Sequence, residues 1–134
     1  MRFLIFIGLT FILLSGCDSP LNEKANFSKS GLQAEVKWIE GPFGNIKKEN
    51  HLVVFLYKDG GLFSLPDGQT LEFYATMPSM GHPLEDPGFF EEIDKGIYLN
   101  KSIHYNMPGD WKNELWIMDA NFNILDRLEW LIYF

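Results

Sequence analysis

The sequence predicts an all-β domain: an immunoglobulin-like Greek-key β-sandwich of about seven strands, with a small β-barrel as the alternative. Short strand-like segments and turn residues follow one another regularly from residue 32 onward, and no segment there has helical periodicity. Hydrophobic residues make up 46% of the chain and aromatic residues 16%. This composition favours β structure and supplies enough apolar material for a folded core.

The expected strands follow from alternation of apolar and polar residues and from the turns between them. They cover residues 32–39, 52–57, 62–65, 70–77, 97–107, 111–118 and 124–134. A long segment without such a pattern, residues 78–95, separates two of them. Its length is unusual for a hairpin, so it is either functional or a crossover between sheets.

In the expected strand over residues 97–107, the alternation of faces separates the candidate ligand Met107 from His104. The residues expected to share one face are Ile97, Leu99, Ile103, Tyr105 and Met107. His104 then lies on the opposite face, and His51 precedes a strand without a soft ligand nearby. Neither histidine is therefore expected to bind a metal.

The N-terminus has the pattern of a bacterial lipoprotein signal. Arg2 is followed by an apolar run, residues 3–14, which is too short to span a bilayer comfortably and matches a signal-peptide core. The run ends in Leu-Ser-Gly before Cys17, the single cysteine of the chain, and this resembles a lipobox. Lipidation at Cys17 is therefore expected to anchor the mature protein to a membrane.

Three regions follow from this interpretation. They are a signal peptide at residues 1–16, the lipidated Cys17 with a flexible tether over residues 17–30, and one domain over residues 31–134. The expected location is the bacterial cell envelope. In a Gram-negative cell, Asp18 after Cys17 resembles the signal for retention at the periplasmic face of the inner membrane.

Charge excludes one class of partner. The formal net charge is -7, and no basic patch for nucleic acid is present. The charge does not exclude a protein partner in the cell envelope. An acidic group in the long segment, Glu85, Asp86, Glu91, Glu92 and Asp94, lacks the ligand spacing of a calcium loop and is interpreted as a solvated loop.

The segment Met77-Pro-Ser-Met80-Gly-His82-Pro combines two thioethers and an imidazole where a strand ends. Met107 ends a later strand and is followed by Pro-Gly-Asp110-Trp111. Thioether and imidazole ligands suit Cu(I) better than hard cations. The candidate metal ligands are therefore Met80, His82 and Met107, with Met77, and they can meet only if both strands finish at the same end of the sandwich.

A structural interpretation of the same residues stays open. Met77 shares strand parity with Phe73 and Ala75, which favours a place in the core. Met107 can equally cap the core, and a histidine in a Gly/Pro loop often only forms loop hydrogen bonds. Gly81 is expected to supply a positive φ in either case.

Together, the Met77–His82 run and the later run from Gly96-Ile-Tyr98 to Met107-Pro-Gly109-Asp-Trp111 resemble the YtkA-like domain family, to which FixH proteins look related. The resemblance covers residues 32–118. It implies an immunoglobulin-like sandwich outside the cytoplasm and a role in copper handling or oxidase assembly. FixH proteins are anchored by an N-terminal transmembrane helix, whereas this chain has a lipobox.

Two function classes follow from these observations. The first is a membrane-tethered domain that binds Cu(I) and passes it on, with Trp111 and Asp110 adjacent to the site. The second is a protein-interaction module that uses the same loop as a recognition surface. An enzyme is not expected, because no Gly-x-Ser-x-Gly motif is present and the single cysteine is assigned to lipidation.

Overall fold

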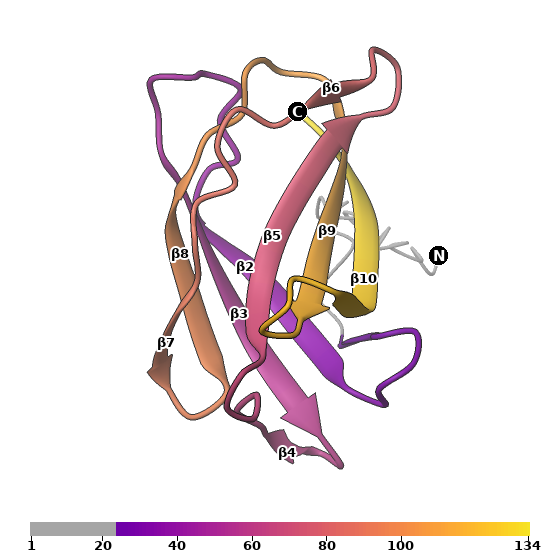
Figure 1. Cartoon of the computed structure of the whole chain (residues 1–134). Coiled ribbons are helices and arrows are strands. Elements are labelled where there is room, and N and C mark those ends of the chain that lie inside the picture. Colours follow the sequence, from indigo (N-terminus) through magenta and orange to yellow (C-terminus); the bar gives the residue numbers. More distant parts are fainter. Residues whose placement is uncertain (1–23) are drawn as a thin grey trace, which may run out of the picture.

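A computed structural model describes residues 24–134 of the chain (Figure 1). The predicted signal peptide, Cys17, Asp18 and the first part of the predicted tether lie outside the described residues. Between residues 24 and 134, no helix is long and apolar enough to cross a membrane.

Two antiparallel sheets face each other in this part of the chain (Figure 1). Their strands are β1 (Ala25–Asn26), β2 (Gln33–Glu40), β3 (Asn50–Lys58), β4 (Gly61–Leu62), β5 (Thr70–Met77), β6 (His82–Pro83), β7 (Glu91–Asp94), β8 (Ile97–Ile103), β9 (Asp110–Met118) and β10 (Ile124–Tyr133). The first sheet has the order β1-β2-β3-β8-β7, with β4 also paired to β3. The second has the order β10-β9-β5-β6.

This strand order confirms the predicted fold class. Strands β2, β3, β8 and β7 follow the A-B-E-D order of an immunoglobulin constant-type sheet, and β5, β9 and β10 follow the C-F-G order of its partner. These are the seven strands of four or more residues, and β1, β4 and β6 have two residues each. The long segment between β5 and β8 is a crossover between the sheets that also contributes β6 and β7.

The core lies between the sheets and is centred on aromatic side chains. Tyr105 and Trp111 are fully buried, with ring centroids 4.9 Å apart. The ring centroid of Tyr105 lies 5.1 Å from that of Phe134 and 6.1 Å from that of Trp38 on β2. Burial raises the pKa of Tyr105, whose hydroxyl donates a hydrogen bond to Asn113. Aromatic pairs in these arrangements add to the stabilisation that burial provides.

One predicted strand is shorter than its sequence pattern indicates. The pattern predicts a strand over residues 97–107, but β8 ends at Ile103, and a single bridge between His104 and Asp86 follows it. Met107 therefore lies in the loop between β8 and β9. It is partly buried and packs against the core.

The predicted common face of this strand is also wrong for its first half. Tyr98 and Asn100 are buried there, whereas Ile103 and Tyr105 are buried in the second half. The pairing with β3 explains the change, because Asn50 pairs with Ile103 and Leu52 with Asn100, which leaves one extra residue on β8. Such a β-bulge reverses which residues of a strand face the core.

Candidate metal centre

The two segments predicted to hold a metal lie at the same end of the sandwich. β5 ends at Met77 and β9 begins at Asp110, and these strands are antiparallel neighbours with Thr76 opposite Lys112. The loop that follows β5 and the loop that precedes β9 are therefore adjacent. We call residues 77–83 and 107–110 the rim, and the opposite end of the sandwich the base.

A tight hairpin between β5 and β6 orients the first segment. The backbone amides of Met80 and Gly81 both donate to the carbonyl of Met77, at 3.3 Å and 2.8 Å. Gly81 has a φ of 65°, which confirms the predicted need for glycine. His82 then pairs with Met77 across the hairpin. Residues directly opposite each other in an antiparallel pair share a face, so His82 lies on the same face as Met77.

Ser79 and Asp110 join the two rim segments. The Ser79 hydroxyl donates to the Asp110 carboxylate at 2.5 Å, and the Ser79 backbone amide donates to it at 3.3 Å. These hydrogen bonds, the serine hydroxyl first, lower the pKa of Asp110. Asp110 therefore docks the hairpin onto the loop that carries Met107.

The methionines occupy different depths at the rim. Met77 is 3% exposed, and a Cβ built on Gly109 would lie only 2.7 Å from its terminal methyl carbon. Glycine at position 109 therefore allows the second loop to lie directly against Met77. Met80, in contrast, is 56% exposed. Met107 is partly buried between these extremes.

Trp111 supports the rim from below. Its indole Nε1 donates to the backbone carbonyl of Met107 at 3.0 Å, and its ring is fully buried against Tyr105. Trp111 therefore fixes the Met107 backbone from inside the sandwich and does not cover the rim from outside.

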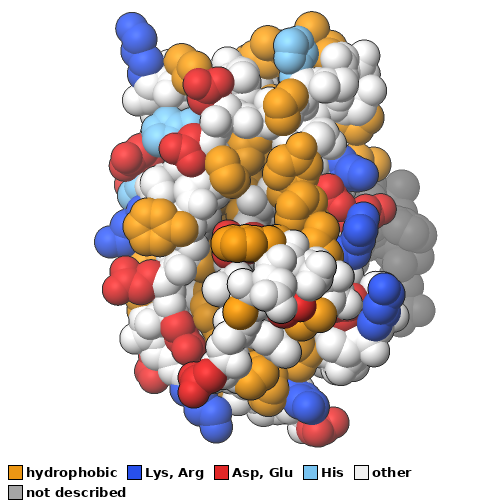
Figure 2. Space-filling model, in the orientation of Figure 1, with side chains coloured by type: hydrophobic (Ala, Val, Ile, Leu, Met, Phe, Trp, Pro, Cys, Tyr) orange, Lys and Arg blue, Asp and Glu red, His pale blue; other side chains and the backbone are white. Residues whose placement is uncertain are grey.

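The surface of the rim contrasts with its surroundings. Around the place of β6, Figure 2 shows hydrophobic side chains and a histidine, whereas acidic side chains gather where Figure 1 places β7. The exposed rim residues, Met80 and His82 among them, include no Asp, Glu, Lys or Arg. The carboxylate of Asp110 already accepts hydrogen bonds from Ser79. The donors left for a ligand are therefore thioethers and one imidazole.

Thioethers are not ligands of typical zinc or calcium sites, and a single imidazole does not make a zinc site on its own. Within residues 24–134, no three His, Cys, Asp or Glu side chains are grouped so that they could hold a metal ion together. The side-chain donors that the rim offers, methionine sulfur and one imidazole, suit Cu(I) better than hard cations.

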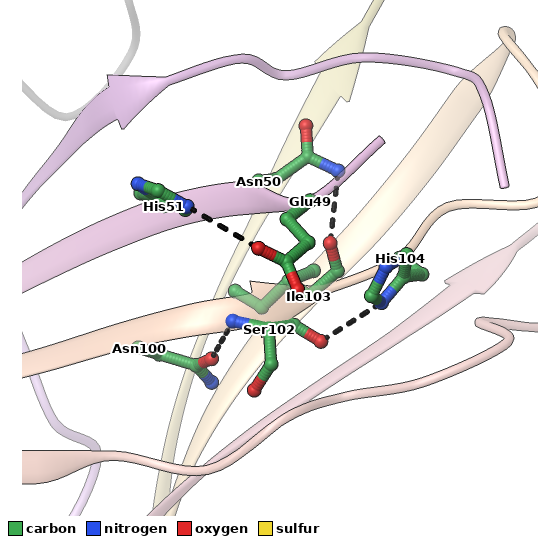
Figure 3. Close-up of polar contacts among 7 residues, drawn as sticks. All are labelled: Glu49, Asn50, His51, Asn100, Ser102, Ile103 and His104. Atoms are coloured by element: carbon green, nitrogen blue, oxygen red, sulfur yellow. Dashed lines mark hydrogen bonds and ion pairs between the residues drawn. The ribbon is translucent and has the colours of Figure 1, made fainter. Parts of the chain in front are cut away.

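A second histidine-bearing surface was not expected from the sequence. A shallow groove of about 550 Å³ is lined by Glu40, Phe43, Lys47, Lys48, Glu49, His51 and His104. In the view of Figure 3, the Glu49 side chain lies between the two imidazole rings. His51 Nε2 lies 3.9 Å from a Glu49 carboxylate oxygen.

Backbone contacts orient one of these rings. His104 Nδ1 lies 3.0 Å from the carbonyl oxygen of Ser102 (Figure 3). A carbonyl oxygen can only accept, so Nδ1 carries the proton and Nε2 is free when the ring is neutral. The two histidines come together because β3 pairs with β8, a long-range pairing that no local sequence pattern indicates.

Comparisons with known proteins support the fold but not a family. No protein-family model matches the chain, and no curated protein matches it. Among solved structures, a copper-bound variant of FetP from uropathogenic Escherichia coli matches with a TM-score of 0.54 and 10% sequence identity. The match covers 85% of this chain and 90% of that one. At this identity the similarity establishes a shared fold over almost the whole of both chains.

Proposed function

We propose that this domain binds copper as Cu(I) at the rim, through Met80, His82 and Met107, with Met77 as the buried member of the set. The observation that carries this proposal is the pair of hydrogen bonds from Ser79 to Asp110. They hold the Met80 and His82 hairpin beside the Met107 loop, so the two segments that carry thioether and imidazole donors are adjacent.

The chemistry of the donors favours copper over other metals. Thioether sulfur is a soft ligand and imidazole is borderline, a combination that selects Cu(I). The structural similarity to a protein whose solved form contains copper is consistent with this choice. The predicted YtkA-like membership would place the domain among proteins suspected of copper handling, and it stays a prediction.

The proposed role is to hold and transfer the ion, as a metallochaperone or in oxidase assembly, without turnover of a substrate. Met80 is exposed, so an incoming partner can reach this ligand directly. Lipidation at Cys17 would keep the exchange at a membrane surface in the cell envelope. A protein partner there would receive or deliver the copper.

The test is Cu(I) competition against a chromophoric chelator. The soluble chain from Asp18 to Phe134 retains the two-sheet core and lacks Cys17. In Met80→Leu/His82→Asn the side-chain volumes are nearly kept while both exposed donors are lost. We expect Cu(I) affinity to fall by at least about 100-fold, which corresponds to about 3 kcal/mol.

The matched control is Met118→Leu/His51→Asn, which makes the same two kinds of change away from the rim. Met118 pairs with Thr70 at the base, and His51 lines the groove. This control should bind Cu(I) as the parent does. Loss of binding in the control alone would move the metal to the groove, and equal binding by all three proteins would leave the rim as a protein-recognition surface.

A further inference from the structure

The ten-residue strand β10 forms one edge of the second sheet, and within residues 24–134 only β9 pairs with it as a strand. Its side chains alternate, with Leu128 and Trp130 buried and their neighbours exposed. Leu131 is 63% exposed and Tyr133 is 85% exposed. A long edge with exposed apolar side chains is a surface on which another strand can add.

The hydrogen bonds of β10 show which backbone groups face outward. Phe134 exchanges hydrogen bonds with Gly109 in both directions, so the even-numbered residues from Asp126 onward direct their backbone hydrogen bonds to β9. The backbone N–H and C=O groups of odd-numbered residues point to the open edge, as the hydrogen bond from the Ser28 amide to the Arg127 carbonyl shows. The loop at Ser28 covers the edge at Arg127. Among the described residues, the edge from Glu129 to Tyr133 has no such cover.

The edge strand β7 of the first sheet differs in charge. β7 is short and carries Glu91, Glu92 and Asp94, all exposed. Two such edges would repel each other, which is one way in which natural sheets prevent edge pairing. The open part of β10 carries one acidic residue, Glu129, beside two large apolar side chains.

We propose that two copies of this chain associate through the Glu129–Tyr133 edge of β10, as antiparallel strands related by a two-fold axis. Leu131 is the middle residue of the open stretch from Glu129 to Tyr133. In a symmetric antiparallel pair, Leu131 of one copy therefore lies opposite Leu131 of the other. Tyr133 then faces Glu129 across the axis, where the phenol hydroxyl can donate to the carboxylate. Three residue pairs exchange about six backbone hydrogen bonds.

This arrangement is self-complementary, and it joins the two four-stranded sheets into one continuous sheet. It is independent of the proposed metal site, because no rim donor takes part in it. The interface does lie beside the rim, since Tyr133 pairs with Asp110 within each copy. Two rims would therefore flank the two-fold axis.

The test is sedimentation of the soluble chain from Asp18 to Phe134 over a concentration series, with a chelator present to exclude metal. The parent should show a reversible dimer. Leu131→Lys places two like charges opposite each other at the axis, so dimer affinity should fall by at least about tenfold. Leu125→Lys makes the same change at another exposed leucine of β10, in the bulge outside the open stretch, and should leave the dimer unchanged.

Cross-linking checks the register. In the proposed dimer the two Cα atoms at position 131 are about 5.5 Å apart, which is within the range for a disulfide. Leu131→Cys should therefore form a covalent dimer under mild oxidation, and Leu125→Cys should not. A monomer at every concentration, or a dimer that Leu131→Lys does not weaken, would overturn the proposal.

Discussion

The base and the rim of the sandwich are each fixed by an aspartate that accepts hydrogen bonds from a serine-bearing loop. Near the base, Asp126 accepts from the Ser28 hydroxyl at 2.8 Å and from the backbone amides of Lys29 and Ser30. At the rim, Asp110 accepts from the Ser79 hydroxyl and amide. The two contacts use the same chemistry.

Burial distinguishes the two aspartates. Asp126 is 4% exposed, whereas the bonds of Asp110 to Ser79 are exposed to solvent. A buried carboxylate has lost its water and depends on protein donors, while an exposed one can exchange them for water at little cost. The base contact therefore stabilises the fold, whereas the rim contact orients a loop and costs little free energy to break.

The largest expected effect is on stability at the base. Asp126→Asn removes the charge that several donors face, and one of its two oxygens becomes an amide donor beside backbone N–H groups. We expect the free energy of unfolding to fall by about 2–3 kcal/mol. Urea denaturation measures it, and Asp110→Asn is the matched change. Equal losses in the two variants would show that burial does not distinguish them.

In the parent protein, acid should remove the stabilisation that the Asp126 carboxylate provides. Burial raises the pKa of Asp126, but hydrogen bonds from Ser30 and Ser28 outweigh it and lower the value to about 2 from 3.8. Because the folded-state pKa is depressed, the stabilisation is complete above about pH 4 and is lost as the pH falls through about 2. It amounts to about 2 kcal/mol.

Denaturation at a series of pH values checks this window. The difference in stability between the parent and Asp126→Asn should be constant at neutral pH and should shrink between pH 4 and pH 2. A difference that stays constant down to pH 2 would mean that the charge of Asp126 does not provide the stabilisation.

The smallest expected effect on stability is that of Asp110→Asn at the rim. This substitution should instead lower the affinity for Cu(I). Asp110→Asn weakens the contact that docks Ser79, so the hairpin with Met80 and His82 is held less firmly. We expect Cu(I) affinity to fall by about tenfold, as for other residues that orient metal ligands. Chelator competition measures it, and unchanged affinity would show that the two loops need no such support.

The fold class and the position of the unusual loop follow from the amino-acid sequence alone. Period-two patterns such as Leu71, Phe73 and Ala75 depend only on which face of a strand is buried, and turn residues such as Gly81 encode a backbone conformation locally. The predicted strand at residues 70–77 therefore matches β5, and Met77 is in the core as its parity indicated.

How distant segments meet depends on the tertiary structure. The bulge that exchanges the faces of β8, the Ser79 contact with Asp110, and the approach of His51 to His104 all depend on strand pairing and register. Register is set by the packing of the whole sandwich, so residues far apart in sequence carry no local sign of it. The sequence supplied the thioethers and imidazoles, and the register of β5, β6 and β9 places them at one end.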